Sequence, residues 1–334
     1  MNVNIYDVAK KSGLSVVTVS RVINNASSVR QYNRDKVLQA MKELGYDPNF
    51  AARSLAKGKT GIIGLVLPVL NDDFFNEVVE EINSRLIDYN YFLSMSLEER
   101  SESAQVSNYL FHQRRVDGII LLSPLFEDEY IDELKRRKIP FVLLDNQKMQ
   151  SSASTVLVDN YKGGFMATQH LLDLGHKKIA FISGTNRYLS NWERKRGYEE
   201  ALKNAGLKPY ATAGEHFDIA EGYKVTSGWL DAGCVPTAIF AADDNIMLGA
   251  YDAIRERGLM VPDDISLIGY DDDTISSEVY PYFSSVRQPG TEMGRKAVEI
   301  LMQLIDKKFK GNTLVVLEPE LVVRKSTAAP KNNL

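Results

Sequence analysis

Several residue types and patterns are scarce in this chain of 334 residues. Cys234 is its single cysteine, which excludes an internal disulfide framework. The four histidines are scattered without the spacing of a metal site, and no apolar run approaches the roughly 18 residues of a membrane-spanning helix. No basic segment followed by a long apolar one opens the chain, as it would in a secretion signal. These absences predict a soluble, cytoplasmic protein with no bound metal or other cofactor.

Motifs of the common enzyme classes are also missing. A phosphate-binding GxGxxG or Walker loop is absent, which argues against a nucleotide-dependent enzyme. The carboxylates have no accompanying Ser/His/Asp set, Cys/His pair or metal-ligand cluster that would complete a catalytic site. We therefore expect a protein that binds other molecules and is not an enzyme.

Composition and charge distribution indicate ordered, separate domains. Hydrophobic residues make up 44% of the chain, and its length allows two or three domains with their own cores. Residues 1–60 contain 10 basic and 4 acidic side chains, so with a total charge of −4 the rest of the chain carries −10. A small basic head on a large acidic body suits contact between the head and phosphates. A sugar-transport protein would explain the body alone and would need an export signal.

The first 24 residues predict two short helices joined by a tight turn at Ser12-Gly13. Asn4 can cap the first helix by accepting the backbone N–H of Asp7, and Gly13 permits the left-handed backbone that ends this helix. Ser15 can cap the second helix, whose inward stripe is Val19, Val22 and Ile23. This arrangement is that of a helix-turn-helix.

The second helix should turn outward Val16, Val17, Thr18, Ser20 and Arg21. In a helix-turn-helix this face enters the major groove of DNA, where an arginine pairs with guanine and apolar groups contact thymine methyls. The alternative is an ordinary three-helix core with an arginine in solvent. A third helix from Asn33 to Gly45 would complete the head, and residues 46–57 are helix-permissive after Pro48 but too short to be stable alone.

From Thr60 onward, strand and helix patterns alternate. Buried parallel strands are predicted at residues 62–67, 118–122, 141–144, 179–182, 238–241 and 265–270. Helices are predicted at residues 74–89, 101–113, 127–137, 162–174, 193–204, 220–232, 246–257 and 291–307. The body is therefore of the α/β class, in which ligands bind beyond the carboxyl ends of the strands.

Six sequence segments stand out in this order: IYDVAKKSGLSVVTVSRVIN, GYDPNFAARSLAKGKT, TGIIGLVLP, VDNYKGGFMATQHLLDLGHKKIAFISG, AIFAADDNIMLGAYDAI and VPDDISLIGYDD. Together they closely resemble the LacI/GalR family of bacterial transcriptional regulators, over essentially the whole chain. The resemblance implies an N-terminal all-α helix-turn-helix head and an α/β body like that of periplasmic binding proteins. That body would have two parallel-sheet subdomains, crossed by three chain segments.

The resemblance also implies domain limits. The head would span residues 1–48, a hinge helix and linker 49–59, and an effector-binding and dimerisation body 60–334. Within the body, one subdomain would comprise residues 60–160 and 289–318, and the other 161–288 and 319–330. A homodimer is implied because two heads must read the half-sites of a pseudo-palindromic, double-stranded operator. The tail after Val323 has no leucine heptads to make a tetramer.

The family's DNA-binding positions carry over residue by residue. Val16, Val17 and Arg21 fall where the recognition helix touches base edges. Phosphate contacts are implied for a polar set, for which helix capping or a place on the helix surface is the alternative: Asn4, Ser15, Thr18, Ser20, Asn24 and Tyr46. Hinge positions in the minor groove, where a leucine pair wedges a base step open, are Asn49, Ala52 and Leu55.

Effector-binding positions carry over to the interdomain cleft. The polar ones are Asp145, Arg194, Asp243, Asp271 and Gln288, and the candidate ring-stacking faces are Phe74 and Phe217. Carboxylates, a guanidinium and aromatic faces suit a sugar. Many family members carry asparagine at the position of Asp243, and an extra acid would favour hydroxyl-rich ligands over a purine or a sugar phosphate. The neighbouring acids, which could equally be helix caps or ion-pair partners, are Asp244, Asp272 and Asp273.

The resemblance therefore implies a repressor of carbohydrate-utilisation genes whose operator affinity changes when a sugar binds. The alternative is a global catabolite-control regulator whose corepressor is a phosphorylated carrier protein. The N-terminal sequence MNVNIYDVA resembles that branch. The segment GTEMGRKAVEILMQL, however, lacks the tyrosine and arginine pattern expected on its carrier-docking face.

Overall fold

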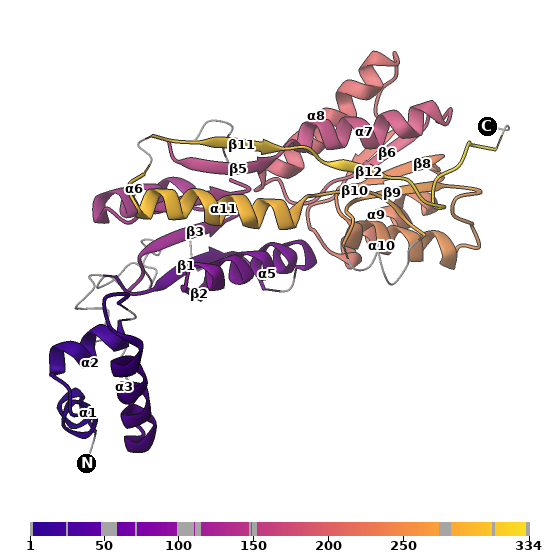
Figure 1. Cartoon of the computed structure of the whole chain (residues 1–334). Helices are drawn as coiled ribbons and strands as arrows, with labels where there is room; N and C mark the ends of the chain where they lie inside the picture. Colours follow the sequence, from indigo (N-terminus) through magenta and orange to yellow (C-terminus); the bar gives the residue numbers. More distant parts are fainter. Residues whose placement is uncertain are drawn as a thin grey trace. The chain divides into compact units, whose positions relative to one another are not determined.

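The computed structural model describes residues 3–24, 26–47, 59–70, 72–98, 110, 115–146, 148, 152–273, 282–308 and 311–331. The chain divides into two units, Met1–Gly61 and Ile62–Leu334. Figure 1 shows the first as a group of helices and the second as strands flanked by helices. None of the helices in the described ranges is both long and apolar enough to cross a membrane.

The first unit contains three helices, α1 (Ile5–Ser12), α2 (Val16–Ile23) and α3 (Gln31–Leu44). Asn4 caps α1 and forms a capping box with Asp7, and Gly13 ends α1 with a φ of 70°. The buried core is Val8, Ala9, Val19, Val22, Val37 and Ala40. The predicted helix-turn-helix is confirmed, and its third helix begins two residues earlier than predicted.

The first sheet of the second unit has the strand order β11-β5-β4-β3-β1-β2 and is parallel throughout. Its strands are β1 (Ile62–Leu67), β2 (Phe92–Leu97), β3 (Gly118–Leu122), β4 (Phe141–Leu144), β5 (Ser154–Val158) and β11 (Leu314–Leu317). Helices α5 (Asp73–Asp88) and α11 (Gly290–Ile305) share a hydrophobic core with Leu65 and Leu67, whereas α6 (Glu127–Arg137) packs in a separate core with Val66. Successive β1 residues thus face opposite sides, which explains a strand that is apolar throughout.

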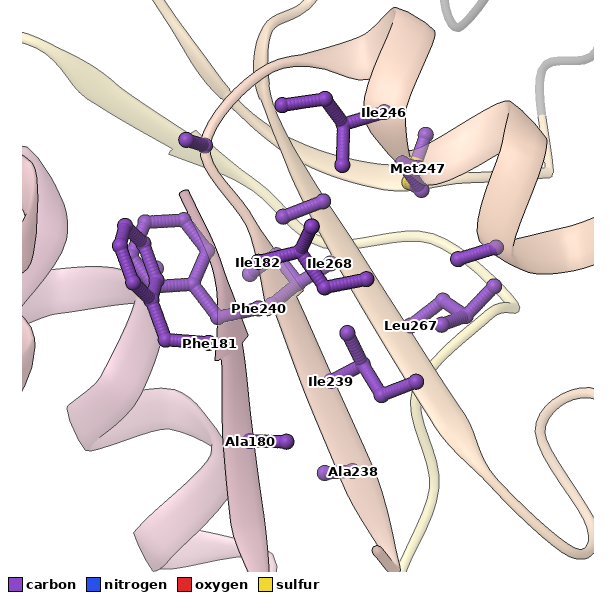
Figure 2. Packing of buried hydrophobic residues seen from close by; sticks show 14 of the residues in the cluster. Ala180, Phe181, Ile182, Ala238, Ile239, Phe240, Ile246, Met247, Leu267 and Ile268 are labelled. Atoms are coloured by element: carbon purple, nitrogen blue, oxygen red, sulfur yellow. The ribbon is translucent and has the colours of Figure 1, made fainter. Parts of the chain in front are cut away.

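The second sheet has the order β12-β10-β9-β8-β6-β7, and only β12 runs antiparallel to its neighbour. Its strands are β6 (Ile179–Ile182), β7 (Ala211–Ala213), β8 (Ala238–Ala241), β9 (Ser266–Asp271), β10 (Ser284–Arg287) and β12 (Glu320–Val322). Its helices are α7 (Asn160–Asp173), α8 (Leu189–Asn204), α9 (Ile219–Asp231) and α10 (Asp244–Glu256). Figure 2 shows Phe181, Phe240, Ile268 and Met247 in the core that these elements share.

The chain passes between the two sheets three times: from β5 to α7, from β10 to α11, and from β11 to β12. Each sheet is therefore completed by strands that are distant in sequence. The candidate ligand site described below lies at the carboxyl ends of β3 and β4 of the first sheet and of β8 and β9 of the second sheet.

Most predicted elements of the body are confirmed. Strands β1, β3, β4, β6 and β8 have the predicted limits, and β9 is shifted by one residue. Helix α8 begins at Leu189, four residues before the prediction, and α10 begins at Asp244. Sequence reasoning did not predict β2, β5, β7, β10, β11 and β12. The predicted helix at residues 101–113 lies outside the described residues except for Leu110.

Candidate functional sites

Helix α2 presents the candidate DNA-reading surface. Ser15 caps it by accepting the backbone N–H of Thr18 at 3.2 Å. Val17 is 62% exposed and Arg21 is exposed, so both are open to a partner. Val16 is half-buried and packs against the core of the head, which corrects the prediction that it faces outward. Val16 is the first residue of α2 and lies three positions before Val19, a buried residue of the same helix.

The other predicted polar contacts of the head have structural roles. Asn4 accepts the backbone N–H groups of Tyr6 and Asp7, and Asn24 donates to the Ser20 carbonyl at 2.9 Å. Tyr46 packs against the core. Thr18 and Ser20 belong to α2, and their side chains are half-buried on the surface of that helix. Contacts of these residues with DNA stay predictions, and Asn49, Ala52 and Leu55 lie outside the described residues.

The second unit gathers polar residues at the carboxyl ends of its strands. Ser123 follows β3, Asp145 follows β4, and Asp271 ends β9. These three residues have φ values of 49°, 47° and 99°, and Asp272 follows with 54°. Non-glycine residues with such backbone angles cost energy and concentrate at functional sites.

Arg194 on α8 is the centre of this site. Its Nε donates to Asn160 Oδ1 at 2.9 Å and its Nη1 to the Ala242 carbonyl at 2.6 Å. Nη2 lies 3.3 Å from Asp271 Oδ1, and the guanidinium stacks on the Tyr270 ring with its Cζ 3.7 Å from the ring centroid. The side chain is 5% exposed, so these contacts hold it in one orientation.

Three predicted carboxylates surround this guanidinium. Asp271 accepts a hydrogen bond from buried Gln288 at 2.6 Å, and Asp145 accepts one from the Ser123 hydroxyl at 2.8 Å. Asp243 is buried and caps α10 by accepting the backbone N–H of Ile246 at 2.7 Å. Burial raises the pKa of all three carboxyls, most strongly that of Asp243.

Asp72 is a fourth carboxylate, which sequence reasoning missed. It caps α5 by accepting the backbone N–H of Phe75 at 2.9 Å. Burial raises its pKa to about 6, and the charges of Asp271 and Arg194 also act on this carboxyl. In a sequence, an aspartate directly before an amphipathic helix indicates only a helix cap, so nothing marked Asp72 as a residue of the ligand site.

We name these residues the Arg194 cluster: Arg194, Asp72, Asp145, Asp243, Asp271 and Gln288. The structure thus brings together all five predicted polar residues of the effector site. Carboxylates and a held guanidinium at strand ends can form paired hydrogen bonds with adjacent hydroxyl groups. Among the described residues, no group of three or more histidine, cysteine, aspartate or glutamate side chains could hold a metal ion.

The two predicted aromatic faces differ. Phe74 is 8% exposed and packs in the core of the first sheet, so the prediction that it offers an open stacking face is corrected. Phe217 is half-buried and lies against Gly184, where a Cβ would come within 2.3 Å of its ring. Its centroid is 6.1 Å from that of Tyr188. Gly184 follows β6, which neighbours β8 and therefore Asp243.

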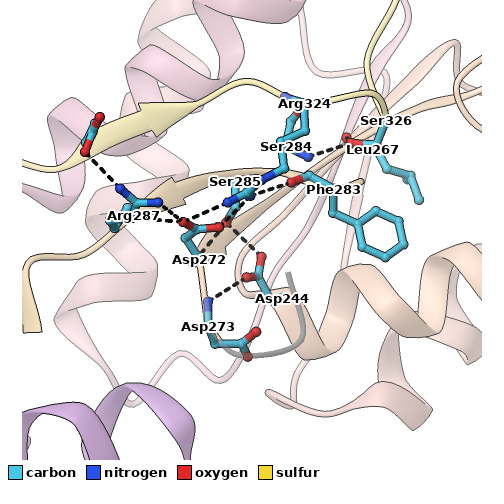
Figure 3. Close-up of polar contacts among 11 residues, drawn as sticks. Asp244, Leu267, Asp272, Asp273, Phe283, Ser284, Ser285, Arg287, Arg324 and Ser326 are labelled. Carbon is cyan, nitrogen blue, oxygen red and sulfur yellow. Dashed lines mark hydrogen bonds and ion pairs between the residues drawn. The ribbon is translucent and has the colours of Figure 1, made fainter. Parts of the chain in front are cut away.

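A second polar network lies beside the cluster (Figure 3). The buried Asp272 carboxylate pairs with Arg287 at 2.7 Å and with Arg324 at 2.6 Å. Asp244 accepts hydrogen bonds from the Ser285 hydroxyl at 2.8 Å and from the Asp273 backbone at 3.1 Å. Asp244 and Asp272 thus have structural roles, which agrees with the alternative that the sequence left open for them. Together they hold the backbone that follows Asp271.

Comparisons with known proteins cover nearly the whole chain. Residues 4–49 match the family described as bacterial regulatory proteins, lacI family, and residues 168–327 match the periplasmic binding protein-like domain. Catabolite control protein A of Priestia megaterium is 35% identical, over 98% of this chain and 100% of the relative. The transcriptional repressor PurR of Histophilus somni (strain 129Pt) is 33% identical, over 96% of this chain and 98% of the relative.

Solved structures give the same result. A lac repressor dimer bound to operator and the anti-inducer ONPF has a TM-score of 0.88 at 34% identity, covering 98% of this chain and 100% of that chain. A complex of the regulator CelR with cellobiose has a TM-score of 0.74 at 31% identity, covering 97% and 99%. The likeness therefore includes both the helical head and the two-sheet body.

Proposed function

The chain belongs to the lacI family of bacterial regulatory proteins, and on that premise we propose that it is a repressor of carbohydrate-utilisation genes whose operator affinity changes when a sugar binds at the Arg194 cluster. It is a DNA-binding transcription regulator and not an enzyme. We place it in the cytoplasm, where bacterial DNA is read.

The observation that carries the ligand proposal is the geometry around Arg194. Its guanidinium is held by Asn160, Ala242 and Asp271, and the carboxylates that surround it come from both sheets. A sugar presents adjacent hydroxyl groups to such paired acceptors, and Phe217 offers an aromatic face beside Asp243. The CelR complex, in which a relative of the same fold is described with cellobiose, supports this ligand class.

For the head, the proposal is that Val17 and Arg21, which are both exposed, contact base edges in a major groove. Asn4, Ser15, Thr18, Ser20, Asn24 and Tyr46 would contact phosphates while keeping their structural roles. The hinge residues Asn49, Ala52 and Leu55 would enter the minor groove. A homodimer would read a pseudo-palindromic operator, as the operator-bound lac repressor dimer suggests.

Ligand binding would reach the head through the first sheet. Asp72, whose carboxyl is affected by the charges of Arg194 and Asp271, caps α5. The backbone N–H of Thr291, at the start of α11, donates to Glu77 on α5 at 2.7 Å. A ligand between these elements would change how the two sheets of the body sit relative to each other. The hinges of two protomers would then lose the arrangement that DNA requires.

The test is fluorescence anisotropy of the full chain on DNA fragments from upstream of its own and neighbouring genes, at fixed salt. We expect specific binding to one fragment and its loss with a carbohydrate from a panel of sugars. The Arg194→Ala variant should bind the same fragment and ignore the sugar. Absence of specific binding to every fragment would contradict the proposal.

A second candidate function is favoured by the 35% identity with Catabolite control protein A. In it, a phosphorylated carrier protein would strengthen operator binding. On α11, Arg295 pairs with Glu292 and Lys296 pairs with Glu299, so these charges are paired within the helix. Operator binding that no sugar alters but that a phosphorylated carrier strengthens would select this candidate.

A further inference from the structure

Helix α11 begins with a cap that comes from another helix. Its N-cap residue is Pro289, which makes no side-chain capping hydrogen bond. Instead, Glu77 Oε1 of α5 accepts both the Thr291 backbone N–H at 2.7 Å and the Thr291 hydroxyl at 2.6 Å. Hydrogen bonds to a charged acceptor are shorter and stronger than neutral ones, so this pair holds the start of α11 to α5.

Gly290 allows this close approach of the two helices. A Cβ at Gly290 would lie 2.8 Å from the carboxyl carbon of Glu77 and 2.8 Å from its Oε2. Four residues later, a Cβ at Gly294 would lie 2.8 Å from the Val78 carbonyl of α5. The first turn of α11 is therefore in close contact with α5, and the bonds between Glu77 and Thr291 are part of that contact.

The segment before Thr291 is also tied to the candidate ligand site. Gln288 is buried, its side chain donates to Asp271 Oδ1 at 2.6 Å, and its backbone N–H donates to the Asp271 carbonyl at 3.3 Å. Pro289 has a φ fixed by its ring, and the Gly290 N–H donates back to the Gln288 carbonyl at 3.0 Å. A short and stiff connection thus leads from Asp271 to Thr291.

The two ends of this connection belong to different sheets. Asp271 ends β9 of the second sheet, and Glu77 lies on α5, which shares the hydrophobic core of the first sheet. We propose that Glu77 is a positioning residue for the regulatory response, because through Thr291 it holds α5 to the segment on which an effector at Asp271 would act. This inference rests on the proposed function and names residues that carry its regulation. Without these bonds, the start of α11 could move without moving α5.

The experiment measures the coupling factor, which is the ratio of the operator dissociation constants with and without saturating sugar. Fluorescence anisotropy of the full chain on its operator fragment gives both constants, with glucose, galactose, ribose and cellobiose as the probes. We expect Glu77→Ala to reduce the coupling factor by about three-fold or more, while the sugar affinity of the free protein, measured by calorimetry, changes by less than about two-fold. Glu77 is exposed, so its replacement leaves the core intact.

Two conservative variants separate the hydrogen bonds from other effects. Glu77→Gln keeps an oxygen that can accept both bonds, and Thr291→Ser keeps both donors, so each should couple as the wild type does. Asp218→Ala removes an exposed capping carboxylate from α9 and should also leave the coupling factor unchanged.

A wild-type coupling factor in Glu77→Ala would overturn the inference while the proposed function stands. An equal loss of coupling in Glu77→Gln or in Asp218→Ala would also overturn it, because the bonds to Thr291 would then not be the cause. If none of the four sugars changed the operator affinity of the wild-type chain, the inference and the proposed function would both fail.

Discussion

Asp72 and Asp243 each combine a local and a long-range role. One carboxylate oxygen of each caps a helix, and the charges of Arg194 and Asp271 act on the same carboxyl. The capping hydrogen bond lowers the pKa of each carboxyl, but burial raises it by more than the bond lowers it. The charged form of each carboxyl is therefore costly in the folded chain. The protein therefore keeps acids where a neutral cap would be more stable.

This cost leads to a prediction for Asp72→Asn. The pKa of Asp72 is raised from 3.8 to about 6, so its contribution to stability is full below 3.8 and is lost as pH rises through 6. Asparagine removes the charge and keeps the cap. We expect the variant to be more stable than the wild type by up to about 3 kcal/mol above pH 7, with a gain that shrinks below pH 6. Denaturant unfolding at several pH values measures this.

The matched control is Asp218→Asn, which alters an exposed cap at the start of α9. Its effect on the free energy of unfolding should be small, because the carboxylate that it removes is exposed. A gain for Asp72→Asn that did not depend on pH would contradict the electrostatic explanation.

Arg194 gives the second prediction at this scale. Arg194→Lys keeps the charge but loses the planar fork that reaches Asn160, Ala242 and Asp271 together. We expect it to bind operator as the wild type does and to need at least ten-fold more effector for release. Anisotropy titrations of the operator complex test this, and full response of the lysine variant would refute the role given to the fork.

At the scale of elements, helix α9 contains two glycines in different surroundings. A Cβ at Gly222 would lie 2.0 Å from the Ile246 carbonyl of α10, whereas a Cβ at Gly228 would meet nothing within 4 Å. We expect Gly222→Ala to destabilise the body by more than about 2 kcal/mol and Gly228→Ala to stabilise it by about 0.5–1 kcal/mol. Thermal unfolding distinguishes them, and equal effects would contradict the close contact of α9 with α10.

Helix α2 gives the prediction for DNA. Arg21 is exposed on the surface that would face the bases, and Arg21→Ala should cost about 1–3 kcal/mol of specific binding and relax operator choice. Lys203→Ala, which removes an exposed cation of the body that pairs with Glu200, should leave the operator affinity unchanged. If both variants bound operator equally well, α2 would not be the reading helix.

The elements also show what the sequence could and could not predict. Strands β1, β3, β4, β6 and β8 were predictable because central parallel strands are apolar on both faces. Strand β2 is at an edge and exposes Phe92, Met95 and Leu97, and β7 and β12 have three residues each, so no apolar run marks them. Their place depends on pairing with strands that are distant in sequence.

The candidate site, like the strands, was predictable only in part. Asp145, Arg194, Asp243, Asp271 and Gln288 were found through motifs, and the structure assembles them. Asp72 was missed because an aspartate before a helix indicates only a cap. Phe74 was wrongly expected to face a ligand, because the sequence pattern of an aromatic residue early in a helix is the same whether its side chain faces a ligand or the core.

At the scale of the whole molecule, the crossovers between sheets connect the candidate site to the rest of the body. Arg287 lies at the end of β10 and Arg324 after β12, and both pair with buried Asp272, next to Asp271. Gln288, which bonds Asp271, is followed within three residues by Thr291, which bonds Glu77. A change at Asp271 thus acts on the segment that leads from one sheet to the other.

The central claim is that effector and operator binding are coupled within one chain. The most direct test measures the affinity of the wild-type chain for its effector by calorimetry, once alone and once saturated with operator DNA. Coupling is reciprocal, so operator should weaken effector binding by the same factor by which effector weakens operator binding, in the range of roughly 5–150-fold. Equal effector affinities with and without operator would contradict the account.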